Sequence, residues 1–421
     1  MTPEVKERIE QIRHGIVPEG YKKLGKDIIP MYWERRSFSE LGIIASGLVD
    51  PREEPFCHMK HVGPENIEKD TGRVLETQTA SELGLISGKF YFDSDSIVYS
   101  KIRPNLNKVC APRFEGICSA DCYSIKPTEA IDKTYLLNLM LDYRFYKRAV
   151  ECSMRTGMPK INQDDLNIIT MCYPGSIAEQ EKIATILTVQ DNVIERKEKL
   201  LAEKQRQKKY LMQQLLTGKK RLPGFDGEWR NVKLNEVLVE RKEKNATQDH
   251  RICSVAVQKG VVDQIEHLGR SYAATDTSNY GVAHYGDIIY TKSPTGDFPY
   301  GIIKQSHMNE DVAVSPLYGI YEPICYEMGY ILHTYFSYAV NCSNYLTPII
   351  QKGAKNTINM TNDVFVSKKL YLPMDKAEQK ALAALFVEAD NEIELLRQSI
   401  EQEKQMKKAL MQLLLTGVVR V

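Results

Sequence analysis

Two stretches of forty residues carry the most regular hydrophobic pattern in this chain. Residues 179–218 and 378–417 contain no internal proline or glycine before a closing Thr-Gly, and they are rich in Glu, Lys, Leu, Gln and Ala. The apolar seam positions are Ile183, Ile186, Ile194, Leu201, Leu211 and Leu215 in the first stretch, and Leu382, Leu385, Ala389, Ile393, Leu396, Ile400, Leu410 and Leu414 in the second. Spacings of three and four predict one apolar seam per helix, the pattern of a coiled-coil pair.

The two predicted helices are copies of one another. They align without a gap at an offset of 199, with sixteen identities in forty positions. The similarity continues outside them, since Pro174 matches Pro373, and Trp33 and Trp229 open related stretches. Residues 97–101 (IVYSK) also match 288–292 (IIYTK). The chain is therefore predicted to be a duplication of one variable domain followed by one long helix.

The N-terminus resembles a detached end of the second helix, because Arg8–Gly15 is similar to the LMQQLLTG and LMQLLLTG endings. We therefore expect the two termini to lie close together and the long helices to run antiparallel, with one globular domain at each end. The predicted division is a first domain at 1–178, whose helical segment 1–16 closes onto the distal helix, a central helix at 179–222, a second domain at 223–377 and a distal helix at 378–421.

The two globular domains alternate short β-rich runs with turn residues and helical stretches. Strands are expected at 96–100, 123–126, 287–291 and 317–321, and helical stretches near Lys133–Val150 and Tyr326–Cys342. This mixture predicts the α+β fold class: two pseudo-twofold-related mixed α/β domains separated by a long antiparallel two-helix coiled coil.

Polar loops follow the matching strands of both domains. Arg, Lys, Asn and Gln side chains reach DNA bases and phosphates, although an ordinary basic surface loop would have the same composition. The candidate DNA-binding residues are Lys60, Lys101, Arg103, Asn105, Asn107, Lys108, Arg155, Lys160 and Asn162 in the first domain, and Lys292, Ser293, Thr295, Lys352, Lys355, Asn356 and Asn359 in the second. Their recurrence at corresponding positions favours the functional interpretation.

The basic run Lys204–Lys209 on the first helix has two interpretations, a solvated helix face or a surface for phosphate or a partner. The repeated Asp-Asn pairs at 191–192 and 390–391 are interpreted as polar register devices or surface residues. A net charge of +1 means that any nucleic-acid site must gather positive charge locally.

The nine cysteines are odd in number and scattered, which favours a reducing, cytoplasmic setting. Cys57-x3-His61 and Cys118-x3-Cys122 remain alternatives as zinc ligand pairs, although neither has the usual spacing, and no metal is expected. His58 and His61 flank Lys60 in a turn expected to contribute DNA contacts rather than acid–base chemistry. The charged start is not a signal peptide, and no apolar stretch is long enough to span a membrane.

Catalytic motifs are missing from the sequence. There is no G-x4-G-K-[ST] or G-x-G-x-x-G sequence for nucleotides, and no [DNS]-P-P-[YFW] tetrapeptide of the kind that amino-methyltransferases use on a flipped base. Asp95 and Lys101 could imitate a nuclease pair, but no further acidic partner is placed beside them. We therefore expect no catalytic residues and no enzymatic activity in this chain alone.

Taken together, the chain resembles the specificity subunits of type I restriction-modification systems. The resemblance rests on the duplicated P-x4-E-Q opening at Pro174 and Pro373, the duplicated L-M-Q-x-L-L-T-G ending, the Gly-Phe-x3-Trp229 sequence and the loop at 101–108. It covers nearly the whole chain.

This resemblance implies two target recognition domains that each read one half of a split DNA site, and helices that dock two modification subunits. The partner subunits would bring S-adenosylmethionine, ATP and Mg²⁺, with a restriction/translocase subunit for cleavage, so no cofactor is expected here. A coiled-coil scaffold, or a specificity subunit of a related DNA-methylation defence complex, is the alternative.

Overall fold

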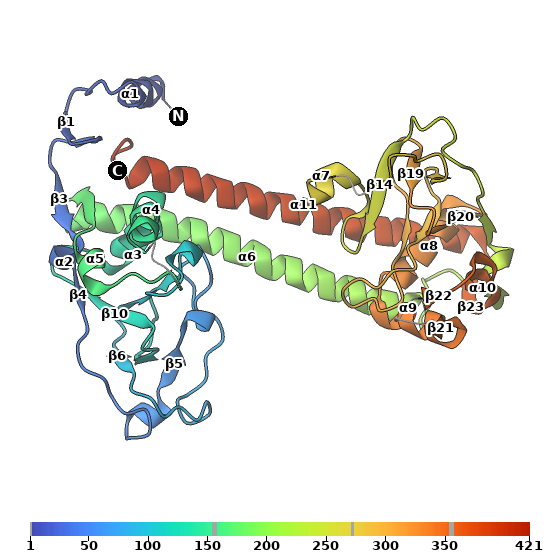
Figure 1. Ribbon diagram of the computed structural model, residues 1–421, viewed down its shortest axis with the longest axis horizontal. Helices are drawn as coiled ribbons and strands as arrows, with labels where there is room; N and C mark the ends of the chain where they lie inside the picture. The colour runs from blue at the N-terminus through green and yellow to red at the C-terminus, as the bar shows by residue number, and fades with distance from the viewer. Residues whose placement is uncertain (1, 154–157, 271–272, 353–357) are drawn as a thin grey trace. The chain divides into compact units, whose positions relative to one another are not determined.

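The computed structural model describes residues 2–153, 158–270, 273–352 and 358–421. The chain forms two compact units, the first made of Met1–Lys197 with Ser399–Val421 and the second of Glu198–Gln398. The long helices α6 (Ile177–Leu215) and α11 (Lys376–Leu414) each contribute to both units (Figure 1). Both predicted long helices are thus confirmed, each beginning two residues early and ending just before Thr-Gly.

The first unit is a mixed α/β domain. Its central sheet has the order β4-β10-β7-β8, a second sheet has the order β5-β9-β6, and β3 pairs with β11. The strands are β1 (Tyr21–Leu24), β2 (Asp27–Pro30), β3 (Trp33–Ser37), β4 (Gly42–Ile44), β5 (Lys60–Val62), β6 (Phe90–Phe92), β7 (Ile97–Ser100), β8 (Val109–Cys110), β9 (Gly116–Cys118), β10 (Cys122–Pro127) and β11 (Thr170–Pro174). The helices are α1 (Pro3–Arg13), α2 (Phe38–Leu41), α3 (Lys133–Leu141), α4 (Tyr143–Cys152) and α5 (Gln163–Asn167).

The second unit repeats these three sheets, with β15 added to the second sheet and with a β21-β22 pair in place of the β1-β2 pair of the first unit. Its central sheet has the order β13-β20-β17-β18, a second sheet has the order β15-β14-β19-β16, and β12 pairs with β23. The strands are β12 (Trp229–Lys233), β13 (Leu238–Glu240), β14 (Arg251–Ala256), β15 (Gly260–Asp263), β16 (Gly281–Ala283), β17 (Ile288–Tyr290), β18 (Ile303–Gln305), β19 (Val312–Val314), β20 (Gly319–Pro323), β21 (Gln351–Lys352), β22 (Ile358–Asn359) and β23 (Lys369–Pro373). The helices are α7 (Gln264–Leu268), α8 (Tyr326–Phe336), α9 (Ala339–Leu346) and α10 (Asn362–Ser367).

The strand pairing confirms the duplication. In each unit the central strand of the second sheet has one parallel and one antiparallel neighbour, as β9 has β5 and β6, and β19 has β14 and β16. The two-stranded sheets match as well: Trp33 of β3 lies opposite Pro174 of β11, and Trp229 of β12 lies opposite Pro373 of β23. The α+β prediction, with matched domains and long helices, is confirmed.

The two expected helical stretches of the globular domains are confirmed, and each consists of two helices. The stretch predicted near 133–150 is α3 and α4, because Asp142 leaves the helical conformation and accepts a hydrogen bond from Arg144 N as the N-cap of α4. The stretch predicted near 326–342 breaks between α8 and α9 at Ser337 and Tyr338. The positions of these breaks were not part of the sequence prediction.

The long helices pair in antiparallel fashion inside each unit. In the first unit Asp191 pairs with Lys407 and Lys197 with Glu403, so the residue number rises on one helix as it falls on the other. In the second unit Lys208 pairs with Asp390 and Lys204 with Glu392. The Asp-Asn positions are thus partly register devices, as one interpretation held, and the basic run at 204–209 is largely engaged within the molecule.

One seam position was wrongly predicted. Ile186 is exposed, whereas the next residue, Leu187, is fully buried. The neighbouring seam residues Ile183 and Ile194 are buried as expected. Residues 183, 187 and 194 are spaced by four and seven, so the seam passes through Leu187 and excludes the residue before it.

In each unit the duplicated tryptophan and the P-x4-E-Q motif are joined by hydrogen bonds. Trp33 Nε1 donates to Glu179 at 3.3 Å, and Trp229 Nε1 donates to Glu378 at 3.1 Å. The following glutamines donate to the carbonyls of the paired prolines, Gln180 to Pro174 and Gln379 to Pro373, both at 2.9 Å. The motif therefore fixes the start of α6 against the β3–β11 sheet and the start of α11 against the β12–β23 sheet.

The ends of the chain meet within the first unit. Tyr21 Oη donates to the Gly417 carbonyl at 2.8 Å, and Arg8 on α1 donates to the Val418 carbonyl at 3.0 Å. Gly417 has a φ of +71°, and a side chain there would collide with Pro30. A hydrophobic helix of membrane-spanning length is absent from the part of the chain that the structure describes.

Candidate nucleic-acid interface

Two of the loops predicted in the first unit are joined by their backbones. Ile161 N donates to the Lys101 carbonyl at 2.9 Å, and Arg103 N donates to the Pro159 carbonyl at 2.8 Å. The segments 101–108 and 158–162 thus form one surface at the end of β7, although more than fifty residues separate them in the sequence. Arg155 lies outside the described residues.

Lys101 is the best-defined cation of this surface. Its ammonium lies 5.2 Å from the ring centre of Tyr123 and 6.0 Å from that of Phe90. Partial burial lowers the pKa of Lys101, and the nearby Lys160 lowers it further. Two like charges in a half-buried setting repel each other, so an approaching anion would relieve this cost.

The remaining candidates of the first unit separate into exposed and structural residues. Arg103, Asn105, Lys160 and Lys60 are exposed, with Lys60 Nζ 5.1 Å from the ring centre of Phe114. The others are engaged by the fold: Asn107 is buried and donates to Asp70 and the Leu141 carbonyl, Lys108 donates to the Pro64 carbonyl, and Asn162 accepts from Asp165 N as the N-cap of α5. These three side chains hold the loops together, and of the three only Asn107 is buried.

The second unit places Lys292 where the first places Lys101, directly after the matching strand. Lys292 is half-buried with a φ of +53°, and its Nζ donates to Asn362 at 2.5 Å. Burial lowers the pKa of Lys292 as well. Ser293 and Thr295 follow in an exposed loop.

The other candidates of the second unit are only partly described. The backbones of β21 and β22 pair Gln351 with Asn359 and Lys352 with Ile358. Lys355 and Asn356 lie outside the described residues. The N-cap of α10 is Thr361, at the position that Asn162 has in the first unit, so the second loop of each unit ends in the same way.

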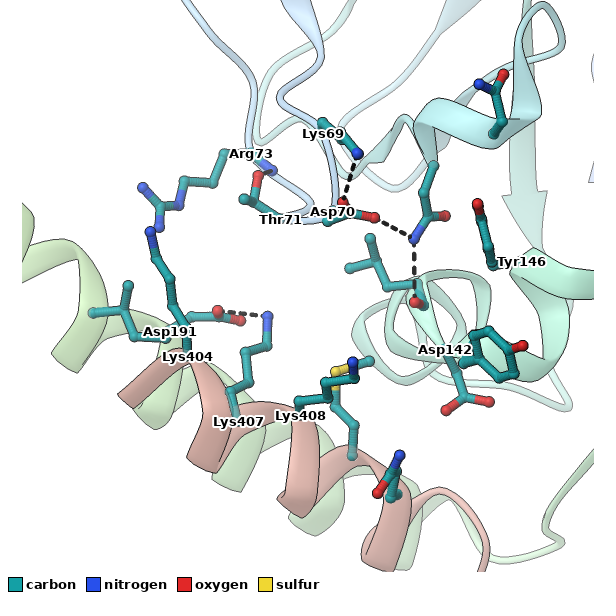
Figure 2. A pocket seen from close by; sticks show the side chains of 17 residues that line it. Lys69, Asp70, Thr71, Arg73, Asp142, Tyr146, Asp191, Lys404, Lys407 and Lys408 are labelled. Carbon is teal, nitrogen blue, oxygen red and sulfur yellow. Dashed lines mark hydrogen bonds and ion pairs between the residues drawn. The ribbon is translucent and has the colours of Figure 1, made fainter. Parts of the chain in front are cut away.

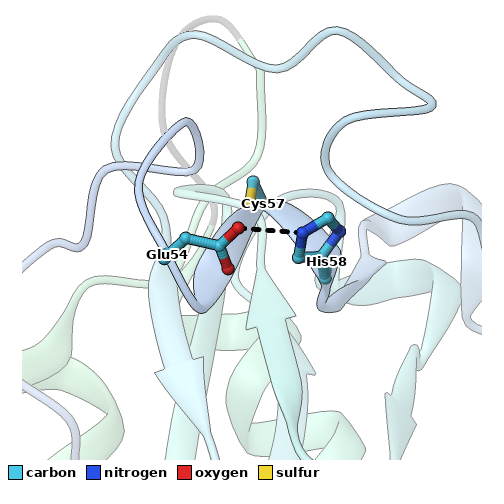
Figure 3. Close-up of side chains that lie close together, drawn as sticks. All are labelled: Glu54, Cys57 and His58. Atoms are coloured by element: carbon cyan, nitrogen blue, oxygen red, sulfur yellow. Dashed lines mark hydrogen bonds and ion pairs between the residues drawn. The ribbon is translucent and has the colours of Figure 1, made fainter.

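A group of potential metal ligands lies at 54–58. Ligand atoms of Glu54, Cys57 and His58 lie within 4.8 Å of one another, and His58 Nε2 is 2.9 Å from Glu54 (Figure 3). This group is neither of the two zinc pairs kept as alternatives in the sequence analysis. Cys118 and Cys122 are buried in an apolar cluster, and burial raises their thiol pKa values.

His61, the other candidate of that turn, is buried, and neither ring nitrogen has a hydrogen-bond partner among the described residues. Burial lowers its pKa. The imidazole is therefore held neutral and away from solvent, which does not suit a role in acid–base catalysis.

A second group of cations was missed by sequence reasoning. Lys69, Arg73, Lys404, Lys407 and Lys408 line a cavity of the first unit together with Asn105. They come from a loop and from the end of α11, so no local pattern joins them. The available signal was the Lys-Lys pair before each L-M-Q sequence, at 208–209 and 407–408.

Comparisons with known proteins agree with this architecture. Residues 66–204 match the type I restriction modification DNA specificity domain. The chain is 37% identical over 181 residues to the Escherichia coli type I restriction enzyme EcoDI specificity subunit, which covers 43% of this chain and 38% of that protein. It is 27% identical over 334 residues to the Methanocaldococcus jannaschii MjaVIII specificity subunit, covering 73% and 75% of the two chains.

Solved structures share the fold over almost the whole chain. One chain from a structure of a type I restriction-modification system has a TM-score of 0.56 at 15% identity, covering 93% of this chain and 99% of that one. The type I S subunit from M. genitalium has a TM-score of 0.53 at 13% identity, covering 96% and 100%. Residues 66–204 are therefore similar to the type I restriction modification DNA specificity domain, and the chain shares its fold with these solved structures.

Proposed function

We propose that the chain is the non-catalytic DNA sequence-specificity subunit of a type I restriction-modification complex, and that it recognises a bipartite target. The observation that carries this proposal is the repeated lysine after the central strand, Lys101 in one unit and Lys292 in the other. Each is half-buried, and burial lowers the pKa of each. Lys101 lies beside the loop at 158–162, and Lys292 donates to Asn362 at the start of α10, as expected of two equivalent readers for two half-sites.

The chemistry of the complex would lie in partner subunits. Two modification subunits docked on the long helices would supply the S-adenosylmethionine reaction, and a restriction/translocase subunit would use ATP and Mg²⁺. The relatives named above are specificity subunits, which supports a role without a cofactor for this chain. The basic and amide side chains of its loops are suited to reading DNA rather than to bond cleavage.

Single substitutions in the assembled complex test this proposal. The target is first found by sequencing methylated positions in host DNA with and without the chain. Lys101→Ala should then weaken recognition of one half-site and Lys292→Ala that of the other. A base contact would cost about 1–3 kcal/mol at one position, whereas a phosphate contact would lower the salt slope by about 1.

Lys126→Ala is the matched control. Lys126 is on the same sheet, but Asp93 holds its ammonium at 2.5 Å, so its removal should leave both half-sites unchanged. Wild-type affinity in both loop variants would contradict the assignment of the loops. A wild-type complex without sequence preference would instead favour a scaffold that does not read DNA.

A further inference from the structure

A cavity of about 560 Å³ lies in the first unit, between the end of α11, the start of α4 and two loops (Figure 2). Its three acidic side chains each have a cationic partner within the molecule. Asp70 lies 3.7 Å from Lys69, and Asp191 lies 2.6 Å from Lys407. Asp142 lies 2.8 Å from Arg144. The acidic lining is therefore already neutralised by the fold.

Cations remain in excess around this cavity. Arg73 from the loop and Lys404 from α11 point toward one another in Figure 2, although Glu68 lies 3.7 Å from Arg73. Lys408, one turn further along α11, is exposed and has no hydrogen-bond or ion-pair partner among the described residues. Convergent positive side chains repel one another, and an anion placed between them would be stabilised by all of them.

In the second unit, a tyrosine covers the corresponding surface of the long helix α6. Lys209 and Gln213 correspond to Lys408 and Gln412 at the offset of 199. Lys209 Nζ lies 5.0 Å from the ring centre of Tyr338, and Gln213 donates to the Tyr338 hydroxyl at 3.3 Å. The side chain of Tyr338 thus contacts both Lys209 and Gln213.

The first unit lacks this cover. Tyr338 is the N-cap residue of α9, and the N-cap residue of the corresponding helix α4 is Asp142. The aspartate is shorter than the tyrosine and is held by Arg144. Lys408 and Gln412 consequently line the cavity and stay available to a group from outside the chain.

The cavity is continuous with the predicted recognition loop. Asn105, an exposed member of that loop, lines the cavity, and Asp70 N donates to the Asn107 carbonyl at 3.3 Å. The loop that carries Lys69 and Arg73 is thus tied to the loop expected to read bases. Lysine, arginine, glutamine and tyrosine are side chains that contact DNA phosphates.

We propose that this cavity holds backbone phosphates of duplex DNA next to the half-site that the first unit reads. The proposal rests on the proposed function and deepens it. Continuity with the recognition loop favours the duplex over an acidic protein segment. Because Tyr338 engages the equivalent residues, the second unit has no matching phosphate site there, and the two units hold the DNA backbone unequally.

The salt dependence of DNA binding tests the proposal. The assembled complex carrying Lys404→Gln and Lys408→Gln is titrated with a duplex containing the target between 50 and 200 mM KCl. Loss of two phosphate contacts should lower the slope of log K against log salt by about 1.8. The loss of affinity across this range should then be about 12-fold smaller than in the wild type.

Lys209→Gln is the matched control, and it should leave the slope unchanged because its ammonium is already placed on Tyr338. An unchanged slope in the double variant, or an equal loss in the control, would overturn the phosphate site. So would loss of modification subunits from the double variant with its slope intact, which would indicate an acidic protein partner. Lack of target preference in the wild-type complex would overturn the proposed function itself.

Discussion

Individual buried side chains set limits on the conditions under which this fold is stable. His333 is the clearest case, because its Nδ1 accepts a hydrogen bond from Gln305 N at 3.0 Å and so must be unprotonated. Burial lowers the pKa of His333 well below its usual value, and Lys304 adds to the effect. The folded state therefore binds a proton less readily than the unfolded state does.

The sign of the pH effect follows from this difference. Below the unfolded pKa of about 6.5, His333 is protonated in the unfolded chain but stays neutral in the folded chain. The free energy of unfolding should therefore fall as the pH is lowered from about 7 to 5. His333→Gln should be less stable at pH 7.5 but lose less stability over this range. Urea unfolding of the Trp33→Phe background, in which Trp229 alone reports the second unit, measures both. An equally steep decline in the variant would contradict the role of His333.

At the residue scale, the sequence located Lys101 and Lys292 because each follows a recognisable strand, and their contact with DNA stays a prediction. Asn107 and Asn162 have the same residue type as DNA-contacting asparagines, but the fold uses their amides for its own hydrogen bonds. The partners of Asn107 lie more than thirty residues away, and Asn162 caps α5 through Asp165 N three residues on; composition alone encodes neither hydrogen bond.

At the scale of elements, the motif glutamates at the starts of the two long helices accept hydrogen bonds of unequal strength. Glu378 is buried and accepts two hydrogen bonds from Arg221 at 2.6 Å, in addition to that from Trp229. Glu179 accepts longer bonds from Trp33 and Tyr32, at 3.3 and 3.2 Å. The same motif residue thus carries more of the stability in the second unit.

Replacing each glutamate by alanine should expose this difference. Glu378→Ala leaves a partly buried guanidinium without its carboxylate and should cost about 3 kcal/mol of unfolding free energy in the second unit. Glu179→Ala should cost the first unit about 1 kcal/mol. Fluorescence of the remaining tryptophan in Trp33→Phe and Trp229→Phe backgrounds follows each unit separately. Equal losses in the two variants would show that Arg221 adds little.

The elements themselves were well predicted wherever periodicity was long or strands were matched. Both long helices and the strands β7, β10, β17 and β20 have residue ranges close to those expected. The breaks at Asp142 and Tyr338 were not predicted; Asp142 caps α4 with its side chain, whereas the side chain of Tyr338 makes no cap hydrogen bond. The cavity beside α11 was also not predictable, since its lining comes from segments that only the tertiary fold brings together.

At the scale of the whole molecule, the duplication predicts that target reading is modular. Replacing residues 223–375 by the equivalent part of a relative should change one half of the target only. The junctions lie outside β12 and β23, so the pairing of Trp229 with Pro373 is transferred intact. Trp229 must be kept in the donor segment because Glu378 lies beyond the junction. Sequencing of methylated sites provides the readout, and a change in both halves would contradict independent reading.

The closing of the chain within the first unit also has a consequence for biosynthesis. Trp33 packs near Gly417, and Tyr21 donates to the same residue, so the first unit lacks part of its core until residues 399–421 are made. At 5–20 residues per second the intervening second unit takes roughly 10 to 40 s to synthesise. The second unit draws on no later segment than Gln398. The half that is translated first is therefore the half that matures last.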